Sequence, residues 1–179
     1  MAAYRIFLTG EPGCGKTTVI EHLCQRLEHL GTQPAGMISR EIRVRESRVG
    51  FRLMDIRTHE SGILAHVDQK AGPRIGRYRV NLMDLEQIGA QSILRAIQNS
   101  AVIIIDEIGP MELTSQLFVH AVKAALTSPK PIVGTIHKRA THSLVTDIKS
   151  NPANNIVEVN NENRDQLPNT IQSQLIGKT

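Results

Sequence analysis

Apolar and polar residues alternate in blocks along the chain, and the period changes from one block to the next. A short apolar run, Tyr4 to Leu8, predicts a first strand, and a glycine-rich loop follows it. After the loop, apolar residues recur at helical spacing from Val19 to Leu27, and Gly31 supplies a stop for this helix. The chain therefore opens with a strand, a glycine loop and a helix.

The segment from residue 36 to 68 has a different pattern. Apolar and charged residues alternate in short bursts such as Ile42-Arg43-Val44-Arg45, and turn residues separate the bursts. This alternation is typical of antiparallel strands with one face in solvent. A glycine- and arginine-rich link then leads to a helix expected from about Asp84 to Asn99. We call residues 36–82 the basic insert and expect it to be a β-rich lid.

From Ala101 onward, strand and helix patterns alternate. The predicted elements are the strand AVIIID, a helix from Thr114 to Thr127 with a Thr or Ser cap, the strand PIVGTI, a helix from near Ala140 or Thr141, the strand NNIVEV and a closing helix NRDQLPNTIQSQL that tolerates Pro168 in its first turns. This order predicts a three-layer α/β fold, with a mostly parallel sheet and helices on both faces. A length of 179 residues fits a single domain, 1–179.

Composition and charge add two expectations. No apolar run approaches the ~18 residues of a membrane span, the first residues lack a signal-peptide layout, and Cys14 and Cys24 are a poor disulfide framework. We therefore expect a soluble cytoplasmic protein. The net charge of +4 is concentrated in residues 40–80, which hold nine of the fourteen arginines and Lys70 against five acidic residues. This segment either meets a negatively charged ligand or is a solvated basic face.

The most specific motif is the loop GEPGCGKT, which matches G-x-x-x-x-G-K-[ST] between a predicted strand and a predicted helix. Its residues are Gly10, Glu11, Pro12, Gly13, Cys14, Gly15, Lys16 and Thr17, and Thr18 continues it. Glycines let backbone N–H groups turn inward around phosphate oxygens, and the helix N-terminus adds partial positive charge. In this motif the lysine reaches the β- and γ-phosphates and the hydroxyl of Thr17 ligates Mg²⁺. The sequence therefore predicts a P-loop that binds a nucleotide.

Two adjacent carboxylates, Asp106 and Glu107, follow the apolar run Val102 to Ile105. Charges at the end of a buried strand are costly unless a cation compensates them. In P-loop proteins an acid at such a strand end holds the nucleotide-bound Mg²⁺, and Asp106 fits this role, directly or through water. Glu107 is the candidate general base that polarises the attacking water. For Glu112, three roles stay open: orienting the base, ligating the metal through water, or capping the next helix.

Asp106 to Gly109 also spell D-x-x-G, which is typical of a GTPase switch. That interpretation requires a guanine-reading N-K-x-D loop, and the sequence has none. We therefore do not favour it.

Further basic residues follow other predicted strands. His137, Lys138 and Arg139 come after PIVGTI, at the sheet edge where ligands bind, and one of them could contact the γ-phosphate. His137 and His142 lack the partners of a metal pair. Arg164 could stack on the nucleotide base or border it, whereas its neighbour Asn163 could simply cap the last helix.

The arginines of the basic insert include Arg40, Arg43, Arg48, Arg52, Arg74, Arg77 and Arg79. A nucleic-acid surface requires aromatic residues interleaved with the cations, and only Phe51 and Tyr78 are present here. A lid that closes over a polyphosphate explains the charge with fewer assumptions, with Arg77 as a possible phosphate contact. Nucleic acid is therefore not an expected partner, and the sequence does not determine the oligomeric state.

Taken together, the motifs resemble the small P-loop nucleoside-triphosphatases first characterised from thermophiles, relatives of the human cancer-related nucleoside-triphosphatase. The resemblance rests on the blocks TGEPGCGKTT, GMISREIR, VGFRLMDI, RIGRYRVN, IIIDEIGPMEL, GTIHKR and NRDQL, in family order over nearly the full length. It implies a RecA-like fold and slow Mg²⁺-dependent hydrolysis of ATP, GTP, CTP and UTP or TTP with little base selectivity. It also implies that the nucleotide contacts the P-loop and the strand end formed by Val102, Ile103, Ile104, Ile105, Asp106, Glu107, Ile108 and Gly109.

Two other functions stay open at this point. One is a small-molecule or nucleotide kinase, in which the basic insert clamps a second substrate. The other is a nucleotide-switched binding module whose turnover is incidental. The adjacent pair Asp106-Glu107 favours water activation, and hence the hydrolase.

Overall fold

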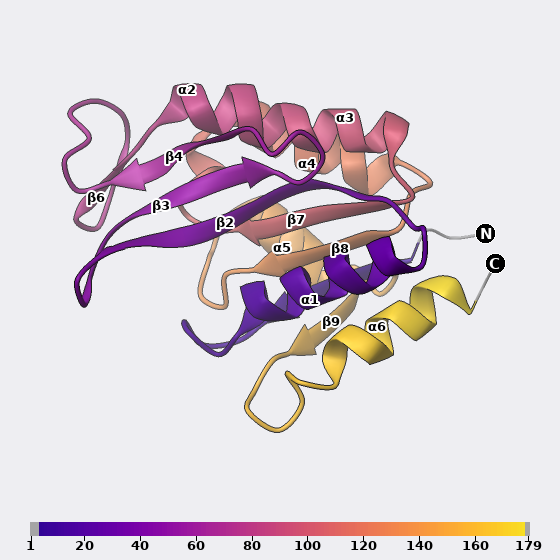
Figure 1. The fold of residues 1–179 in the computed structure, drawn as a ribbon. Coiled ribbons are helices and arrows are strands. Elements are labelled where there is room, and N and C mark those ends of the chain that lie inside the picture. The colour runs from indigo at the N-terminus through magenta and orange to yellow at the C-terminus, as the bar shows by residue number, and fades with distance from the viewer. Residues whose placement is uncertain (1–3, 178–179) are drawn as a thin grey trace.

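The computed structural model describes residues 4–177, whose nine strands form one mixed sheet (Figure 1). The strands are β1 (Arg5–Thr9), β2 (Pro34–Val44), β3 (Ser47–Asp55), β4 (Ser61–His66), β5 (Arg74–Ile75), β6 (Tyr78–Val80), β7 (Val102–Ile108), β8 (Ile132–Ile136) and β9 (Asn155–Glu158). The helices are α1 (Lys16–His29), α2 (Leu82–Asp84), α3 (Gln91–Asn99), α4 (Gln116–Thr127), α5 (Ser143–Ser150) and α6 (Leu167–Ile176), with a π-helical segment, Leu85–Ala90, and a 3₁₀ turn, Glu112–Thr114.

The sheet has a parallel half and an antiparallel half, in the order β5-β6-β4-β3-β2-β7-β8-β1-β9. Strands β2, β7, β8, β1 and β9 pair in parallel, and β2, β3, β4, β6 and β5 pair antiparallel. Strand β2 belongs to both halves. The expected α/β class with parallel strands and an antiparallel segment is confirmed, but the sheet is mixed rather than mostly parallel, since four of its eight strand pairings are antiparallel. The strands of the basic insert continue the same sheet, and we call β3 to β6 the antiparallel extension.

Side-chain alternation along the central strands builds two cores. On β1, Ile6 and Leu8 join the cluster packed under α1 and α6, whereas Phe7 faces the cluster under α3, α4 and α5. On β7, Ile104 and Ile105 are divided between the two clusters in the same way. A strand apolar on both faces must be covered on both, which explains the helical layers on either side in Figure 1.

The joint between the two halves depends on a glycine. Gly36 on β2 lies opposite Ile104 on β7 with a φ of +127°. A Cβ atom added at Gly36 would lie 2.0 Å from the carbonyl oxygen of Ile104, so no other residue fits without moving the backbone. The two strands can approach closely only because this position has no side chain.

Three helix starts differ from the expected positions by a few residues because polar side chains cap them. Helix α4 begins after Ser115, whose hydroxyl accepts from the N–H of Phe118, and α5 begins after His142, whose ring accepts from Leu144. The helix expected from Asp84 begins at Leu82, because Asn81 accepts from the Asp84 N–H. The last helix begins later than NRDQL predicts, at Leu167, with Pro168 in its first turn as expected.

Candidate active site

A cleft of about 900 Å³ opens at the carboxyl ends of the central parallel strands. The P-loop forms one wall, the end of β7 and the loop after β8 form the base, and the antiparallel extension continues the floor. Pockets of this size accommodate ligands as large as a nucleotide.

Gly10 and Gly15 give the P-loop its shape. Both have positive φ, +144° and +104°, and a Cβ at Gly10 would lie 2.7 Å from the Val159 carbonyl oxygen. Lys16 is the first residue of α1, and its Nζ donates to the carbonyl oxygens of Gly10 at 3.2 Å and Glu11 at 3.4 Å. The cation is therefore held over the loop, at a helix N-terminus with no acidic residue in its first turn.

A one-residue bulge places the two carboxylates of β7. Ile105 is opposite Gly134 on β8, but Ile108 is opposite Ile136, so β7 has one more residue than β8 in this interval. In a regular strand adjacent side chains point to opposite faces, and a bulge interrupts that alternation. Asp106 and Glu107 lie in the interval, and both interact electrostatically with Lys16. The bulge thus lets two neighbours serve one site.

Both carboxylates are short of hydrogen-bond partners. Asp106 Oδ1 accepts from the hydroxyl of Thr135 at 2.6 Å, and Thr17 also bonds to this carboxylate, but its Oδ2 is buried without a partner. Glu107 lines the cleft, and its Oε1 is likewise buried and unpartnered. Burial raises the pKa of Asp106 to about 6, against the lowering effect of the two hydroxyls. Burial also raises the pKa of Glu107, which Lys16 partly offsets.

Glu112 completes a cluster of three acids. It lies in the 3₁₀ turn after β7, is almost fully buried, and accepts backbone hydrogen bonds from itself and Gly109. Burial, and then the charge of Glu107, raises the pKa of Glu112 to about 8. A carboxyl with this pKa is largely protonated near neutral pH. Of its three possible roles, capping α4 belongs instead to Ser115.

The basic residues after β8 line the mouth of the cleft. Lys138 Nζ pairs with Glu11 at 3.0 Å and with Glu158 at 2.7 Å, and Arg139 reaches Glu11 at 3.4 Å. His137 lines the cleft next to Gly109, and burial followed by the charge of Lys16 lowers its pKa, so it is mostly neutral. The cations after β8 therefore contact the P-loop itself.

Arg164 lies on the other side of the P-loop, beyond β1. Its Cδ is 3.3 Å from the position of a Cβ built at Gly15, and its Nε is 3.7 Å from Asp165. Asn163 does not cap α6; its side chain instead closes the preceding turn with Asn160. Arg164 thus borders the loop without lining the cleft.

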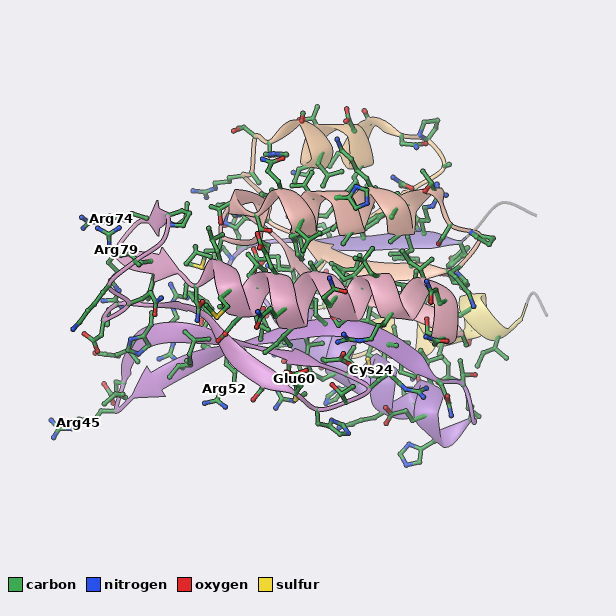
Figure 2. All side chains as sticks on the ribbon, turned by 90° about the horizontal axis from the view of Figure 1, so that it is seen from above. Cys24, Arg45, Arg52, Glu60, Arg74 and Arg79 are labelled. Atoms are coloured by element: carbon green, nitrogen blue, oxygen red, sulfur yellow. The ribbon has the colours of Figure 1, made fainter. Side chains whose placement is uncertain are left out.

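Seven of the nine arginines of the basic insert divide into two groups. Arg40, Arg43 and Arg48 line the cleft. The other four do not: Arg52, Arg74, Arg77 and Arg79. Figure 2 shows Arg74 and Arg79 projecting from the end of the extension, and Arg77 bonds instead to the hydroxyl of Tyr78. The arginines of the insert that face the cleft thus come from the β2–β3 hairpin, and Arg77 remains a predicted phosphate contact without a position on the cleft wall.

Other predicted residues occupy structural positions. Val102 to Ile105 are buried in the middle of the sheet, as is Ile108, and of the predicted strand end only Glu107 and Gly109 line the cleft. Cys14 is half-buried, and burial raises the pKa of Cys24, labelled in Figure 2, to about 12, so that thiol is unreactive. Sequence reasoning missed Thr135, which orients Asp106 from the neighbouring strand.

The donor set near the P-loop fits a magnesium ion bound to a nucleotide. Within residues 4–177, no group of three or more His, Cys, Asp or Glu side chains is arranged to hold a metal by itself. Mg²⁺ in phosphate sites takes one or two carboxylates and completes its shell with water and phosphate oxygens. The unpartnered Oδ2 of Asp106 beside the hydroxyl of Thr17 matches that smaller requirement.

No helix in the described part of the chain is long and apolar enough to span a bilayer.

Comparison with known proteins places this geometry among nucleotide-hydrolysing proteins. A family model described as NTPase matches residues 5–172. The nucleoside-triphosphatase THEP1 of Thermofilum pendens is 44% identical over 169 residues, 94% of this chain and 93% of that protein, and THEP1 of Thermotoga maritima is 42% identical over 171 residues, 96% and 95% respectively.

Two solved structures have the same fold. The crystal structure of THEP1 from Aquifex aeolicus superposes with a TM-score of 0.84 at 33% identity, over 96% of this chain and 99% of that one. The solution structure of a human cancer-related nucleoside triphosphatase gives a TM-score of 0.83 at 33% identity, over 99% and 100%.

Proposed function

This chain belongs to the NTPase family and is a nucleoside-triphosphatase, and from that premise we propose that it hydrolyses the γ-phosphate of Mg²⁺-bound ATP, GTP, CTP, UTP or TTP with Glu107 as the general base. The observation that carries the proposal is the pair of buried, unpartnered oxygens, Asp106 Oδ2 and Glu107 Oε1, beside the P-loop. A polar atom buried without a partner costs stability, and a bound ligand would supply both missing partners.

The nucleotide's phosphates are bound by the P-loop. The loop and the first residues of α1 line the cleft, and Lys16 exchanges its two carbonyl contacts for β- and γ-phosphate oxygens. None of these contacts reads a base, which supports low base selectivity. Arg139 and Lys138 already lie at the loop through Glu11, from where either can reach the γ-phosphate.

The metal position is assigned to Thr17 and Asp106, with Asp106 acting directly or through water. Thr135 holds Oδ1 of this carboxylate at 2.6 Å and leaves Oδ2 for the ion or its water. When bound, Mg²⁺ neutralises charge on the β- and γ-phosphate oxygens. The two carboxylates on β7 thus have different roles: Asp106 binds the metal and Glu107 activates the water.

Glu107 accepts a proton from the attacking water at Oε1. Its raised pKa brings the carboxylate closer to the operating pH, where a general base is most effective. Glu112 is buried, interacts electrostatically with Glu107 and is a candidate for orienting it. We also propose a cytoplasmic location, which the two free cysteines favour, and basic-insert residues that act as a lid.

The decisive experiment measures phosphate release from ATP, GTP, CTP and UTP with no other substrate present. We expect steady release from all four, lost in EDTA and reduced by about 10²- to 10³-fold in Lys16→Ala, because that variant loses a positioned phosphate ligand. Exposed Lys123→Ala, on α4, is the matched control and should behave like wild type. Release that continues in Lys16→Ala, or tight binding without release, would overturn the proposal.

A further inference from the structure

We propose that the end of the cleft remote from the P-loop is a second binding subsite, which takes a planar aromatic ring bearing an anionic group, of the chemical class of a nucleoside monophosphate. The cleft runs without interruption from the P-loop to Arg48, Phe51 and Tyr78 on the antiparallel extension. The proposal rests on the proposed orientation of the triphosphate, and it adds a ligand that hydrolysis by itself does not require.

Aromatic and apolar groups form the floor of this subsite. Phe51 and Tyr78 pack edge to face, with ring centroids 5.3 Å apart and an interplanar angle of 70°. Leu64 and Ile75 line the same end of the cleft. Arg48 lies across both rings, its Cζ 5.0 Å from the Phe51 centroid and 5.9 Å from that of Tyr78. A flat ring can stack on Phe51 or on the guanidinium plane of Arg48.

Arg48 is held in place before any ligand arrives. Its Nε donates to the Tyr78 hydroxyl at 3.0 Å and its Nη1 to Glu41 at 2.7 Å. Arg77 packs on the same tyrosine, 5.2 Å from the ring centroid, and donates to the Arg48 carbonyl oxygen. A guanidinium fixed by its neighbours loses little conformational freedom on binding an anion, and this preorganisation strengthens recognition.

The charge around the floor favours an anion. Arg40, Arg43 and Arg48 line this part of the cleft against two carboxylates, Glu21 and Glu41. Glu41 is shared between Arg43 and Arg48, and Glu21 is paired with Arg40. The cations therefore outnumber the acids, and phosphate is a group that arginine binds through paired N–H donors.

The subsite is separate from the position of the triphosphate. In the sheet order, β3 is four strands from β1, about 19 Å at the usual strand spacing. A triphosphate that extends from the carboxylates on β7 across the P-loop after β1 directs its base toward β9, where Arg164 borders Gly15. The aromatic floor lies in the opposite direction, beyond the γ-phosphate. One nucleotide in this orientation cannot occupy both places.

The test titrates AMP into the protein after its P-loop has been filled with Mg²⁺ and the non-hydrolysable analogue AMPPNP at one molecule per chain. We expect calorimetry to show one further AMP per chain. Ribose 5-phosphate, which lacks the ring, and adenosine, which lacks the anion, should each bind at least about fivefold more weakly, since stacking and charge both contribute.

Variants on one hairpin provide matched controls. Arg48→Gln should weaken AMP binding about tenfold or more, since it removes a charged donor from the cleft. Arg45→Gln removes the same charge from the tip of that hairpin, where Figure 2 shows Arg45 projecting away from the molecule, and should leave AMP binding unchanged. Phe51→Leu should weaken AMP about fivefold or more while it keeps an apolar side chain in place.

Several outcomes would overturn the second subsite. These are no AMP binding to the AMPPNP complex, equal losses in Arg48→Gln and Arg45→Gln, or binding of single-stranded oligonucleotides but not of AMP. The proposed function is tested separately. ATP hydrolysis without AMP binding removes only the subsite, whereas AMP binding without phosphate release removes only the proposed function.

Discussion

The carboxylates on β7 and the arginines of the β2–β3 hairpin line the same cleft but satisfy their charges in different ways. Asp106 and Glu107 are buried and each keeps an oxygen without a hydrogen-bond partner. Arg40, Arg43 and Arg48 are more exposed, and each is paired with a glutamate of its own surroundings. Buried unpaired groups cost several times more free energy than exposed pairs gain.

This difference indicates where the chain depends on its ligand. At the end of β7, buried oxygens lack the partners that the proposed metal-bound nucleotide would supply. In the β2–β3 hairpin the arginines already have partners, and any molecule that binds there competes with existing ion pairs. Under the proposed function, the chemistry therefore depends on the first region.

The largest effect is expected where the unpartnered group does the chemistry. Glu107→Gln should lower phosphate release by about 10²- to 10⁴-fold while MgATP binds almost normally, because the metal-binding Asp106 is intact and only the proton acceptor is lost. Stopped-flow phosphate release and nucleotide titration measure the two quantities.

Exposed Glu162→Gln is the control for this substitution and should match wild type. If Glu107→Gln turned over at the wild-type rate, the free oxygen at this position would have no part in catalysis. The contrast between the two regions would then lose its functional meaning.

An intermediate effect is expected on stability, through Glu112. Burial raises the pKa of Glu112 to about 8, so the unfolded chain releases this proton at lower pH than the folded protein does. Folding stability contributed by this group therefore falls as the pH rises from about 5 to 8. Glu112→Gln cannot ionise and should gain about 1 kcal/mol or more in unfolding free energy over wild type across that interval.

Urea unfolding without nucleotide at pH 5, 6.5 and 8 measures this difference. Glu162→Gln, which alters an exposed carboxylate, should show no such trend. Parallel curves for wild type and Glu112→Gln would mean that Glu112 ionises as easily in the fold as in the unfolded chain.

The smallest effect is expected for an arginine that is already paired. Arg40→Gln removes the ion pair with Glu21, in which the two charged groups are 2.6 Å apart. Because both side chains are partly exposed, the unfolding free energy should change by less than about 1 kcal/mol. The same urea titration measures it. A loss of several kcal/mol would show that the β2–β3 hairpin depends on its ion pairs as strongly as the end of β7 is proposed to depend on its ligand.

The parts of this fold that follow from local pattern were predictable from the sequence. The P-loop, the strand that carries Asp106 and the alternation of strands and helices depend on short spacings and are present as expected, although β7 continues past Asp106 to Ile108. The bulge at Asp106-Glu107 was not predictable, because one extra residue in β7 leaves no trace in the hydrophobic pattern. Its effect, two adjacent acids in one site, was the part visible in the sequence.

Contacts between distant segments also escaped prediction. Thr135 meets Asp106 only because β8 pairs with β7 in a particular register, and nothing near Thr135 in the chain specifies it. Whether the side chains of Arg48 and Arg74 point into the cleft likewise depends on how their hairpins are placed in the folded sheet. Charge counts treat these two arginines alike, whereas the fold places one in the cleft and the other in solvent.

The glycine at the joint of the sheet links the position of the extension to one contact. Gly36 is where β2 meets β7, and its missing side chain lets the two strands lie close together. A residue with a side chain at this position would press on the carbonyl oxygen of Ile104 and push β2 away from β7. Because the antiparallel extension is joined to the sheet through β2, that shift would carry the arginine-lined end of the cleft with it.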